Sequence, residues 1–178
     1  LFRSEGMRAL GLTPGPVTPD SDRAPRFPPG VVGTITHTQW WAAAAVARDT
    51  QRAALGVDVE PDTVLKASLF GSVLTPGEIA LLEQVDEPLR GLVGKLVFSA
   101  KECAYKAQYT LSRTFYGFHG MRVELPWLLG ATALPDEGEF RAVFLRDAGP
   151  FVTGDALHGR YVRAGGYLMT GVELRHAP

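Results

Sequence analysis

The chain has 178 residues, of which 46% are hydrophobic and 21% are charged, a composition typical of a globular protein rather than a disordered one. Its formal net charge of −1 provides no general attraction to nucleic acid or to a membrane surface. The one cysteine, Cys103, excludes an internal disulfide and suits a reducing cytoplasm, and the longest apolar stretch, 40–47, is too short to cross a bilayer.

The first third of the chain predicts a short helix, a loop and two extended segments. Residues 3–10 have helical character, and residues 13–30, rich in proline, glycine and aspartate, predict a loop. The β-branched run 31–37 predicts a strand. Residues 40–47 are rich in alanine, which favours a helix, but their neighbours favour the second strand of a hairpin.

The rest of the chain predicts one strand, then helices, then strands. Residues 55–60 predict a short strand closed by Pro61. A capping box at 75–78, with proline at the first helical position, starts a helix that extends to about residue 84. A longer helix with an apolar stripe covers about 88–109. The last strands are expected at 121–125, 140–146, 159–163 and 167–174, with Gly165-Gly166 as a hairpin turn. This order predicts an α+β fold.

Two carboxylates alternate along the strand Gly56-Val57-Asp58-Val59-Glu60. Because side chains two residues apart on a strand share a face, Asp58 and Glu60 lie close together. Like charges at that distance resist joint ionisation unless a cation lies between them, and oxygen ligands of this kind suit Mg²⁺. The alternative is an edge strand with a solvated acidic face.

A second group of charges lies on the long helix. Glu102 and Lys106 are four residues apart and therefore share one helical face. A carboxylate followed one turn later by a lysine suits a site for phosphate and metal, although a surface ion pair is the alternative. Ser99 and Glu102 also have capping-box spacing, but the apolar stripe begins ten residues earlier, which places Ser99 inside the helix.

Two further segments could donate to phosphates. Thr36 and His37 end the predicted strand 31–37, where a hydroxyl and an imidazole could face an anion. Arg23 and Arg26 lie on a proline-spaced loop and could bind phosphates bidentately. The alternatives are a structural histidine and a solvated loop.

In this order the motifs resemble the 4′-phosphopantetheinyl transferase superfamily, of the type that serves siderophore, polyketide and nonribosomal peptide synthetases. The resemblance rests on the segments 25–30, 33–37, 56–60 and 98–107. It implies two similar α+β halves related by a pseudo-twofold axis, with coenzyme A in the cleft between them. We therefore expect one unit over residues 1–178, with an N-terminal half of about 1–54 and a C-terminal half of about 55–178. Relatives of this type usually have more sequence before Leu1, so we expect the natural N-terminus to be missing.

The resemblance also implies roles for individual residues. The expected ligands of Mg²⁺ are Asp58, Glu60 and Glu102. The expected catalytic residues are Asp58, Glu102 as the base for the attacking hydroxyl, and Lys106 at the transferred phosphate. The expected contacts with coenzyme A come from Arg23, Arg26, Thr36, His37, Lys101 and Lys106.

The implied reaction transfers 4′-phosphopantetheine from coenzyme A to a serine of an apo acyl or peptidyl carrier protein, depends on Mg²⁺ and releases 3′,5′-ADP. The carrier is expected to contact exposed positions within 65–73. We expect a cytoplasmic monomer without nucleic-acid or membrane partners. Two alternatives are a non-catalytic homologue that binds carrier proteins and a Mg²⁺-dependent phosphoesterase.

Overall fold

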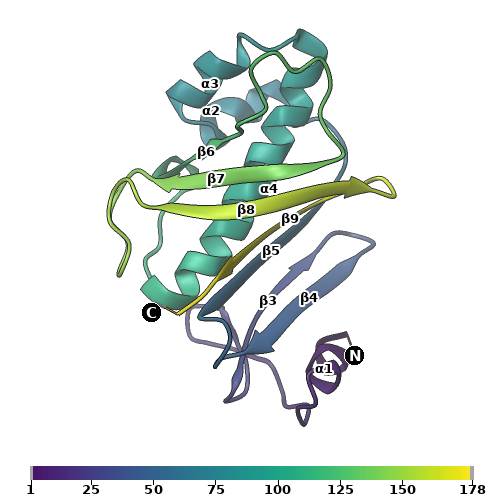
Figure 1. Cartoon of the computed structure of the whole chain (residues 1–178), viewed down its shortest axis with the longest axis vertical. Coiled ribbons are helices and arrows are strands. Elements are labelled where there is room, and N and C mark those ends of the chain that lie inside the picture. Colours follow the sequence, from purple (N-terminus) through teal and green to yellow (C-terminus); the bar gives the residue numbers. More distant parts are fainter. Residues whose placement is uncertain (1, 177–178) are drawn as a thin grey trace.

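The computed structural model describes residues 2–176 and has a mixed α/β architecture (Figure 1). The N-terminal part contains α1 (Phe2–Ala9), β1 (Thr18–Pro19), β2 (Pro25–Arg26), β3 (Val31–His37) and β4 (Ala42–Arg48). The middle part contains β5 (Ala54–Pro61), a 3-10 turn (Ala67–Leu69), α2 (Phe70–Val73), α3 (Pro76–Leu82) and α4 (Glu87–Ser112). The C-terminal part contains a 3-10 turn (Phe118–Gly120), β6 (Met121–Glu124), β7 (Glu137–Phe144), β8 (Ala156–Ala164) and β9 (Tyr167–Leu174).

The alanine-rich segment after β3 is a strand and not a helix. β3 and β4 pair antiparallel in continuous register, from Val31 opposite Arg48 to His37 opposite Ala42. At the turn, the hydroxyl oxygen of Thr38 accepts from the backbone N–H groups of the two following tryptophans. Pairing with β3 therefore overrides the helix propensity of alanine, as tertiary context commonly does.

The second half of the chain is built on a five-stranded antiparallel sheet with the order β5-β9-β8-β7-β6. The 26-residue helix α4 lies across one face of this sheet (Figure 1). Gly56 permits the closest approach, because a Cβ atom there would lie 1.9 Å from the backbone oxygen of Cys103. The turn between β8 and β9 is formed by Gly165 and Gly166, both with positive φ, as a two-residue hairpin turn requires.

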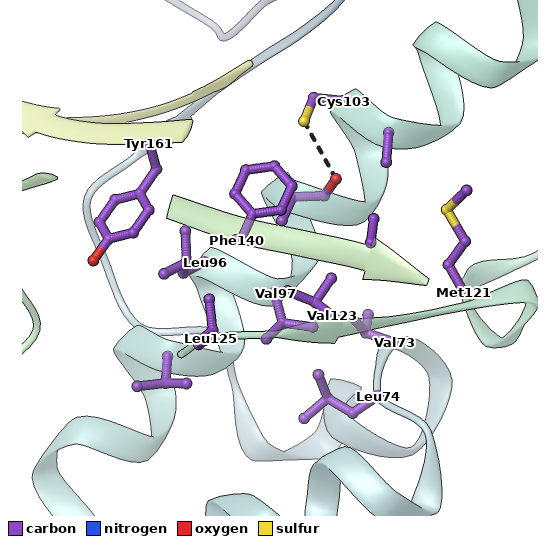
Figure 2. Packing of buried hydrophobic residues seen from close by; sticks show 14 of the residues in the cluster. Val73, Leu74, Leu96, Val97, Cys103, Met121, Val123, Leu125, Phe140 and Tyr161 are labelled. Atoms are coloured by element: carbon purple, nitrogen blue, oxygen red, sulfur yellow. Dashed lines mark hydrogen bonds between the residues drawn. The ribbon is translucent and has the colours of Figure 1, made fainter. Parts of the chain in front are cut away.

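The main core lies between α4 and the sheet (Figure 2), and α2 and α3 lie at one end of it (Figure 1). Fully buried side chains from α4, such as Leu96, meet Phe140 of β7 and Leu168 of β9. Buried apolar groups are the main stabilising contribution to such a layer. The core thus fixes α4 against the sheet and sets the distance between β5 and the charged residues of α4.

Two threonines of β3 attach the hairpin to the edge of the sheet. The hydroxyl of Thr34 accepts from the backbone N–H of Val57 at 3.4 Å, and the hydroxyl of Thr36 accepts from the N–H of Val59 at 3.2 Å. These N–H groups lie on the side of β5 that does not pair with β9, where an unpaired backbone donor is costly if buried. The two sheets therefore meet beside β5.

Most predicted elements are present with small shifts of their ends. The capping box is formed by Thr75 and Glu78 at the start of α3, and Ser99 lies well inside α4. The predicted strand 140–146 instead covers Glu137–Phe144, because the chain turns back after Phe144, whose N–H donates to the carbonyl of Asp155. Helix α2 and the short β1–β2 pair were not predicted, since neither segment is long enough to show a periodic pattern. No helix among residues 2–176 combines the length and apolar character needed to span a bilayer.

Candidate functional site

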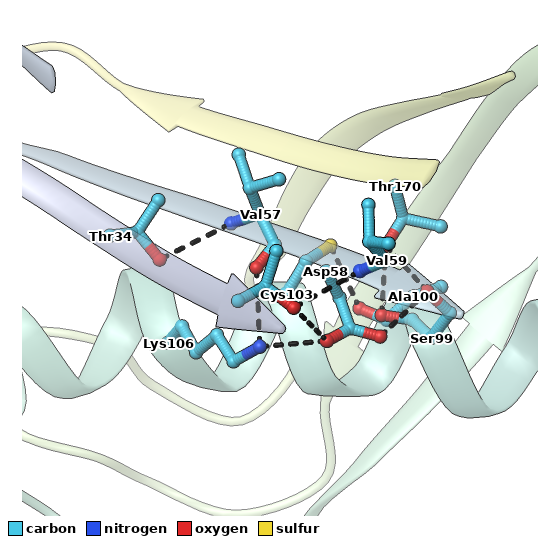
Figure 3. A network of polar contacts seen from close by, with 10 residues as sticks. Thr34, Val57, Asp58, Val59, Ser99, Ala100, Cys103, Lys106 and Thr170 are labelled. Carbon is cyan, nitrogen blue, oxygen red and sulfur yellow. Dashed lines mark hydrogen bonds and ion pairs between the residues drawn. The ribbon is translucent and has the colours of Figure 1, made fainter. Parts of the chain in front are cut away.

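Asp58 lies on the face of β5 that meets α4 and is 5% exposed. Three side chains donate to its carboxylate (Figure 3). Lys106 Nζ lies 2.7 Å from Oδ1, Ser99 Oγ lies 2.9 Å from Oδ2, and Thr36 Oγ1 lies 3.2 Å from Oδ1. A buried carboxylate is tolerated because it is both paired with a cation and hydrogen-bonded. The contacts hold its two oxygens in a defined orientation.

Glu60 is paired with a second lysine of α4. Its Oε2 accepts from Lys95 Nζ at 3.0 Å, and the same ammonium lies 5.6 Å from the centre of the Phe98 ring. Lys95 and Lys106 are about three helical turns apart. The acidic face of β5 is therefore matched by a basic face of α4.

Glu102 lies on α4 one turn before Lys106. Burial raises the pKa of the Glu102 carboxyl above its ordinary value, and the neighbouring carboxylates Asp58 and Glu60 raise it further, whereas Lys106 opposes the shift. Burial and like charge both disfavour the ionised form. A carboxylate with a raised pKa accepts a proton more readily near neutral pH, which suits a general base.

The carboxylates of Asp58, Glu60 and Glu102 are ligands that suit a hard cation, but their side chains are not arranged around one common point in this structure. Within the described part of the chain, no three histidine, cysteine or acidic side chains are gathered closely enough to hold a metal ion. The acidic groups that act on the pKa of Glu102 are the carboxylates of Asp58 and Glu60, and carboxylate oxygens suit Mg²⁺ and not a soft metal. Asp58 and Glu60 both raise the pKa of Glu102, as neighbouring negative charges do, and a cation beside Glu102 would offset this effect.

Two hollows share Tyr105 and Phe115 in their walls, and Lys106 lines one of them whereas Glu102 lines the other. A cleft of about 480 Å³ lies between α4, β3 and the 22–27 loop. Among the residues that line it are Arg23, Arg26, Phe27, Thr34, Tyr105, Lys106 and Arg113. A narrower pocket of about 190 Å³ is lined by Lys101, Glu102, Tyr105, Phe115, Tyr116, Gly117, Phe118 and Met121. The walls of the cleft are basic in part, and those of the pocket are largely aromatic.

The rim of the larger cleft is attached to α4 by Asp22. Its Oδ2 accepts from the hydroxyl of Tyr109 at 2.8 Å and from Arg113 at 3.2 Å. The backbone N–H of Ala24 and then the Tyr109 hydroxyl hold the pKa of Asp22 below its ordinary value. The next residue, Arg23, has φ of 68°, a conformation uncommon outside glycine. These contacts fix the loop that presents the arginines.

Two protein-family models match this chain. One, described as the 4′-phosphopantetheinyl transferase superfamily, matches residues 54–153, more than half of the chain. The chain belongs to the 4′-phosphopantetheinyl transferase superfamily. The second model, described as the 4′-phosphopantetheinyl transferase N-terminal domain, matches residues 3–47.

Similarity to named members of the superfamily extends over nearly the whole chain. The chain is 36% identical over 176 residues to 4′-phosphopantetheinyl transferase Svp of Streptomyces mobaraensis, covering 93% of this chain and 65% of Svp. It is 31% identical over 169 residues to Npt of Nocardia iowensis, covering 92% of this chain and 73% of Npt. It is 28% identical over 169 residues to PptT of Mycobacterium tuberculosis, covering 93% of this chain and 71% of PptT. The chain thus spans about two thirds of the length of these transferases.

The structure pairs Lys106 with Asp58 and Lys95 with Glu60, and Glu102 lies one helical turn before Lys106. Lys101, by contrast, points away from Asp58. The Lys101 ammonium donates to Glu78 Oε2 at 2.7 Å and to the carbonyl of Val73 at 2.9 Å, and the residue is 3% exposed. Burial lowers the pKa of Lys101, and Glu78 opposes this shift. Successive helical residues point about 100° apart, so Lys101 faces α3 while Glu102 faces the acidic strand. This placement does not support the prediction that the Lys101 ammonium contacts a phosphate.

The other predicted contacts with coenzyme A divide into two groups. Arg23 and Arg26 line the larger cleft together with Lys106. Thr36 is 4% exposed and donates to Asp58, so its hydroxyl serves the carboxylate in this structure. His37 is exposed at the end of β3, beyond the residues of that strand that line the cleft.

Beyond the residues that line the two hollows, three residues that contact Asp58, Glu60 or Ser99 were not assigned to the site from sequence. Lys95 lies seven residues before Glu102, a spacing of two helical turns that could have indicated a shared face. The sequence pattern around Ser99 indicates only a capping-box spacing and no contact with Asp58. Thr170 contacts Ser99 from β9, 71 residues away in sequence, and no local pattern signals such a contact.

Proposed function

We propose that this protein transfers 4′-phosphopantetheine from coenzyme A to a serine of an apo acyl or peptidyl carrier protein and releases 3′,5′-ADP. The observation that carries the proposal is the position of Glu102 and Lys106. They occupy one turn of α4, beside the buried Asp58, where a basic cleft meets an aromatic pocket. The names of the three transferase relatives support the same reaction.

The two hollows suit the two ends of coenzyme A. The larger cleft presents Arg23, Arg26 and Arg113, and guanidinium groups bind phosphates bidentately. Lys106, which also lines this cleft, is near the place where the diphosphate would pass from one hollow to the other. The narrow pocket, with its apolar walls, would receive the pantetheine arm. The exposed His37, at the end of β3, would contact the nucleotide phosphates from the side, whereas the buried Thr36 would act through its hydrogen bond to Asp58.

The chemistry follows from the positions of the charged groups. The serine hydroxyl of the carrier attacks the β-phosphorus of coenzyme A. A new O–P bond forms, and the bond from phosphorus to the oxygen of 3′,5′-ADP breaks. Glu102 accepts the proton of the serine hydroxyl, for which its raised pKa is suited. Lys106 stabilises the negative charge of the phosphoryl oxygens.

Mg²⁺ is the metal that we propose for this site, with Asp58, Glu60 and Glu102 as the residues that would hold it. When bound, Mg²⁺ would neutralise phosphate charge and orient the diphosphate. Lys95 and Lys106 neutralise two of these carboxylates in the structure described here. A bound cation would share the carboxylates with these ammonium groups.

The carrier protein is proposed to approach exposed positions within residues 65–73, which lie between β5 and α3. In this segment Leu65 and Val73 are buried, whereas Leu69 is 44% exposed and Lys66 is also exposed. An exposed apolar group beside a basic one suits an acidic helical surface. We further propose a cytoplasmic monomer with two similar halves, 1–54 and 55–178, related by a pseudo-twofold axis. The division is supported by the two family models, which match on either side of residues 48–53.

The proposal is tested by substitutions that preserve shape and remove charge. Asp58→Asn and Glu102→Gln should each reduce release of 3′,5′-ADP by more than 100-fold in the presence of coenzyme A, Mg²⁺ and an apo carrier. Glu139→Gln, at an exposed position of β7, is the matched control. Circular dichroism must show that each variant is folded. Near-normal turnover by either folded site variant would overturn the assignment. Release of 3′,5′-ADP without attachment of phosphopantetheine to the carrier would indicate a phosphoesterase.

A further inference from the structure

A pair of buried hydroxyl groups lies directly behind Asp58. Ser99 of α4 and Thr170 of β9 are both 0% exposed, and their hydroxyl oxygens lie 2.9 Å apart. Ser99 Oγ also lies 2.9 Å from Asp58 Oδ2, and Thr170 Oγ1 lies 3.0 Å from the backbone oxygen of Ser99. Figure 3 shows the three residues in one continuous network.

The direction of these hydrogen bonds follows from counting protons. An ionised carboxylate can only accept, so the single hydroxyl proton of Ser99 is directed to Asp58. The hydroxyl of Thr170 then donates either to Ser99 Oγ or to the Ser99 carbonyl. With either choice the Ser99 hydroxyl still donates its hydrogen bond to Asp58 Oδ2. Thr170 therefore supports this hydrogen bond without touching the carboxylate.

A serine inside a helix has a competing choice. Its hydroxyl can rotate and donate to the carbonyl four residues earlier in its own helix, which for Ser99 is that of Lys95. The contact with Thr170 opposes this rotation, because it holds Ser99 Oγ on the side of the helix that faces β9 and β5. The hydroxyl pair thus orients Asp58 Oδ2 on one side while Lys106 binds Oδ1 on the other.

We propose that Ser99 and Thr170 are positioning residues for the Asp58 carboxylate. The proposal rests on the proposed function, in which Asp58 helps to hold the divalent cation and the diphosphate. Partners that orient a metal-binding side chain typically change metal affinity or activity by 10- to 100-fold when they are removed. Neither residue can touch coenzyme A directly, since both are fully buried.

Thr170 provides the sharper test because two substitutions separate its shape from its hydroxyl. Thr170→Val keeps the shape and removes the hydroxyl, whereas Thr170→Ser keeps the hydroxyl. We expect Thr170→Val to lower kcat about 10-fold and to weaken Mn²⁺ binding, measured by electron paramagnetic resonance, by a similar factor. KM for coenzyme A should stay within about twofold. Thr170→Ser should restore both quantities, and Ser99→Ala should reduce both by about 10- to 100-fold.

Thr75→Val controls for a general loss of stability. Thr75 is also buried, at 7% exposed, but its hydroxyl caps α3 on the side of α4 that faces away from Asp58. This variant should lower the unfolding temperature and leave Mn²⁺ affinity and kcat unchanged. Wild-type kcat and Mn²⁺ affinity in folded Thr170→Val and Ser99→Ala would overturn the inference. A wild-type protein that neither transfers nor binds Mn²⁺ would overturn the proposed function itself, and the inference with it.

Discussion

Substitution of Gly56 by alanine should disrupt the contact on which the site is built. An added Cβ would lie 1.9 Å from the backbone oxygen of Cys103 and 2.9 Å from the backbone nitrogen of Ala107, where at least 3.0 Å is needed. Because both atoms belong to the backbone of α4, no side-chain rotation relieves the clash. The strand and the helix must instead separate by about 1 Å.

This separation has a cost for both folding and activity. Overpacking of a core typically costs about 1–3 kcal/mol, and a clash with rigid backbone belongs at the upper end, about 3 kcal/mol. For a domain of this size that loss lowers Tm by roughly 6–12 °C. The contacts of Asp58 with Lys106 and Ser99, at 2.7 and 2.9 Å, would also lengthen. A misplacement of about 1 Å can reduce catalysis about 100-fold.

Thermal unfolding followed by circular dichroism measures the first effect, and release of 3′,5′-ADP below Tm measures the second. Gly77→Ala is the control, because no atom lies within 4 Å of a Cβ added at Gly77 in α3. Removal of a helical glycine should stabilise the protein slightly, by about 0.5–1 kcal/mol. A Gly56→Ala variant with wild-type Tm and wild-type transfer would refute the account of how α4 and β5 are held together.

Three further predictions concern groups around the site. Cys103 is 0% exposed, and burial raises the pKa of its thiol to about 12. At pH 8 this thiol should therefore react with a disulfide reagent only as fast as the protein unfolds. Rapid reaction of the native protein would contradict this. Glu78→Gln leaves the buried Lys101 ammonium without its counter-charge and should cost about 3–5 kcal/mol in urea unfolding. The double variant Glu78→Gln/Lys101→Met should recover part of that loss, and an equal loss in both variants would show that the ion pair is not the cause. The backbone N–H of Ala24 and the Tyr109 hydroxyl lower the pKa of Asp22. The contact between Asp22 and Tyr109 should therefore stabilise the fold at any pH above the ordinary aspartate pKa. This stabilisation should disappear as the pH falls through the lowered pKa of Asp22. Carbon-13 NMR of the Asp22 carboxyl should show this low pKa and its rise in Tyr109→Phe, and an unchanged pKa in that variant would contradict the assignment.

The sequence predicted the acidic strand because its signal is local. The alternation of side chains along a strand places Asp58 and Glu60 on one face of it. The four-residue spacing of Glu102 and Lys106 places these two on one face of a helix. The partner of Lys106 could not be predicted from spacing alone. In the structure Lys106 pairs with Asp58, because the close packing permitted by Gly56 brings strand and helix together.

The placement of Lys101 could have been predicted more closely than it was. This residue follows Val97 by four positions and precedes Ala104 by three, and both neighbours are buried. The helical period therefore already indicated a buried lysine. By contrast, the contact between Ser99 and Thr170 joins α4 to the last strand of the sheet. Such a contact depends on the strand order β5-β9-β8, which residue patterns alone do not determine.

Transfer of phosphopantetheine is tested most simply by the intact mass of an apo carrier protein after incubation with this protein, coenzyme A and Mg²⁺. The carrier should gain the mass of one phosphopantetheine on its serine, and EDTA should abolish the gain. Absence of a mass gain across several acyl and peptidyl carriers, with folded protein and bound coenzyme A, would contradict the proposed transfer.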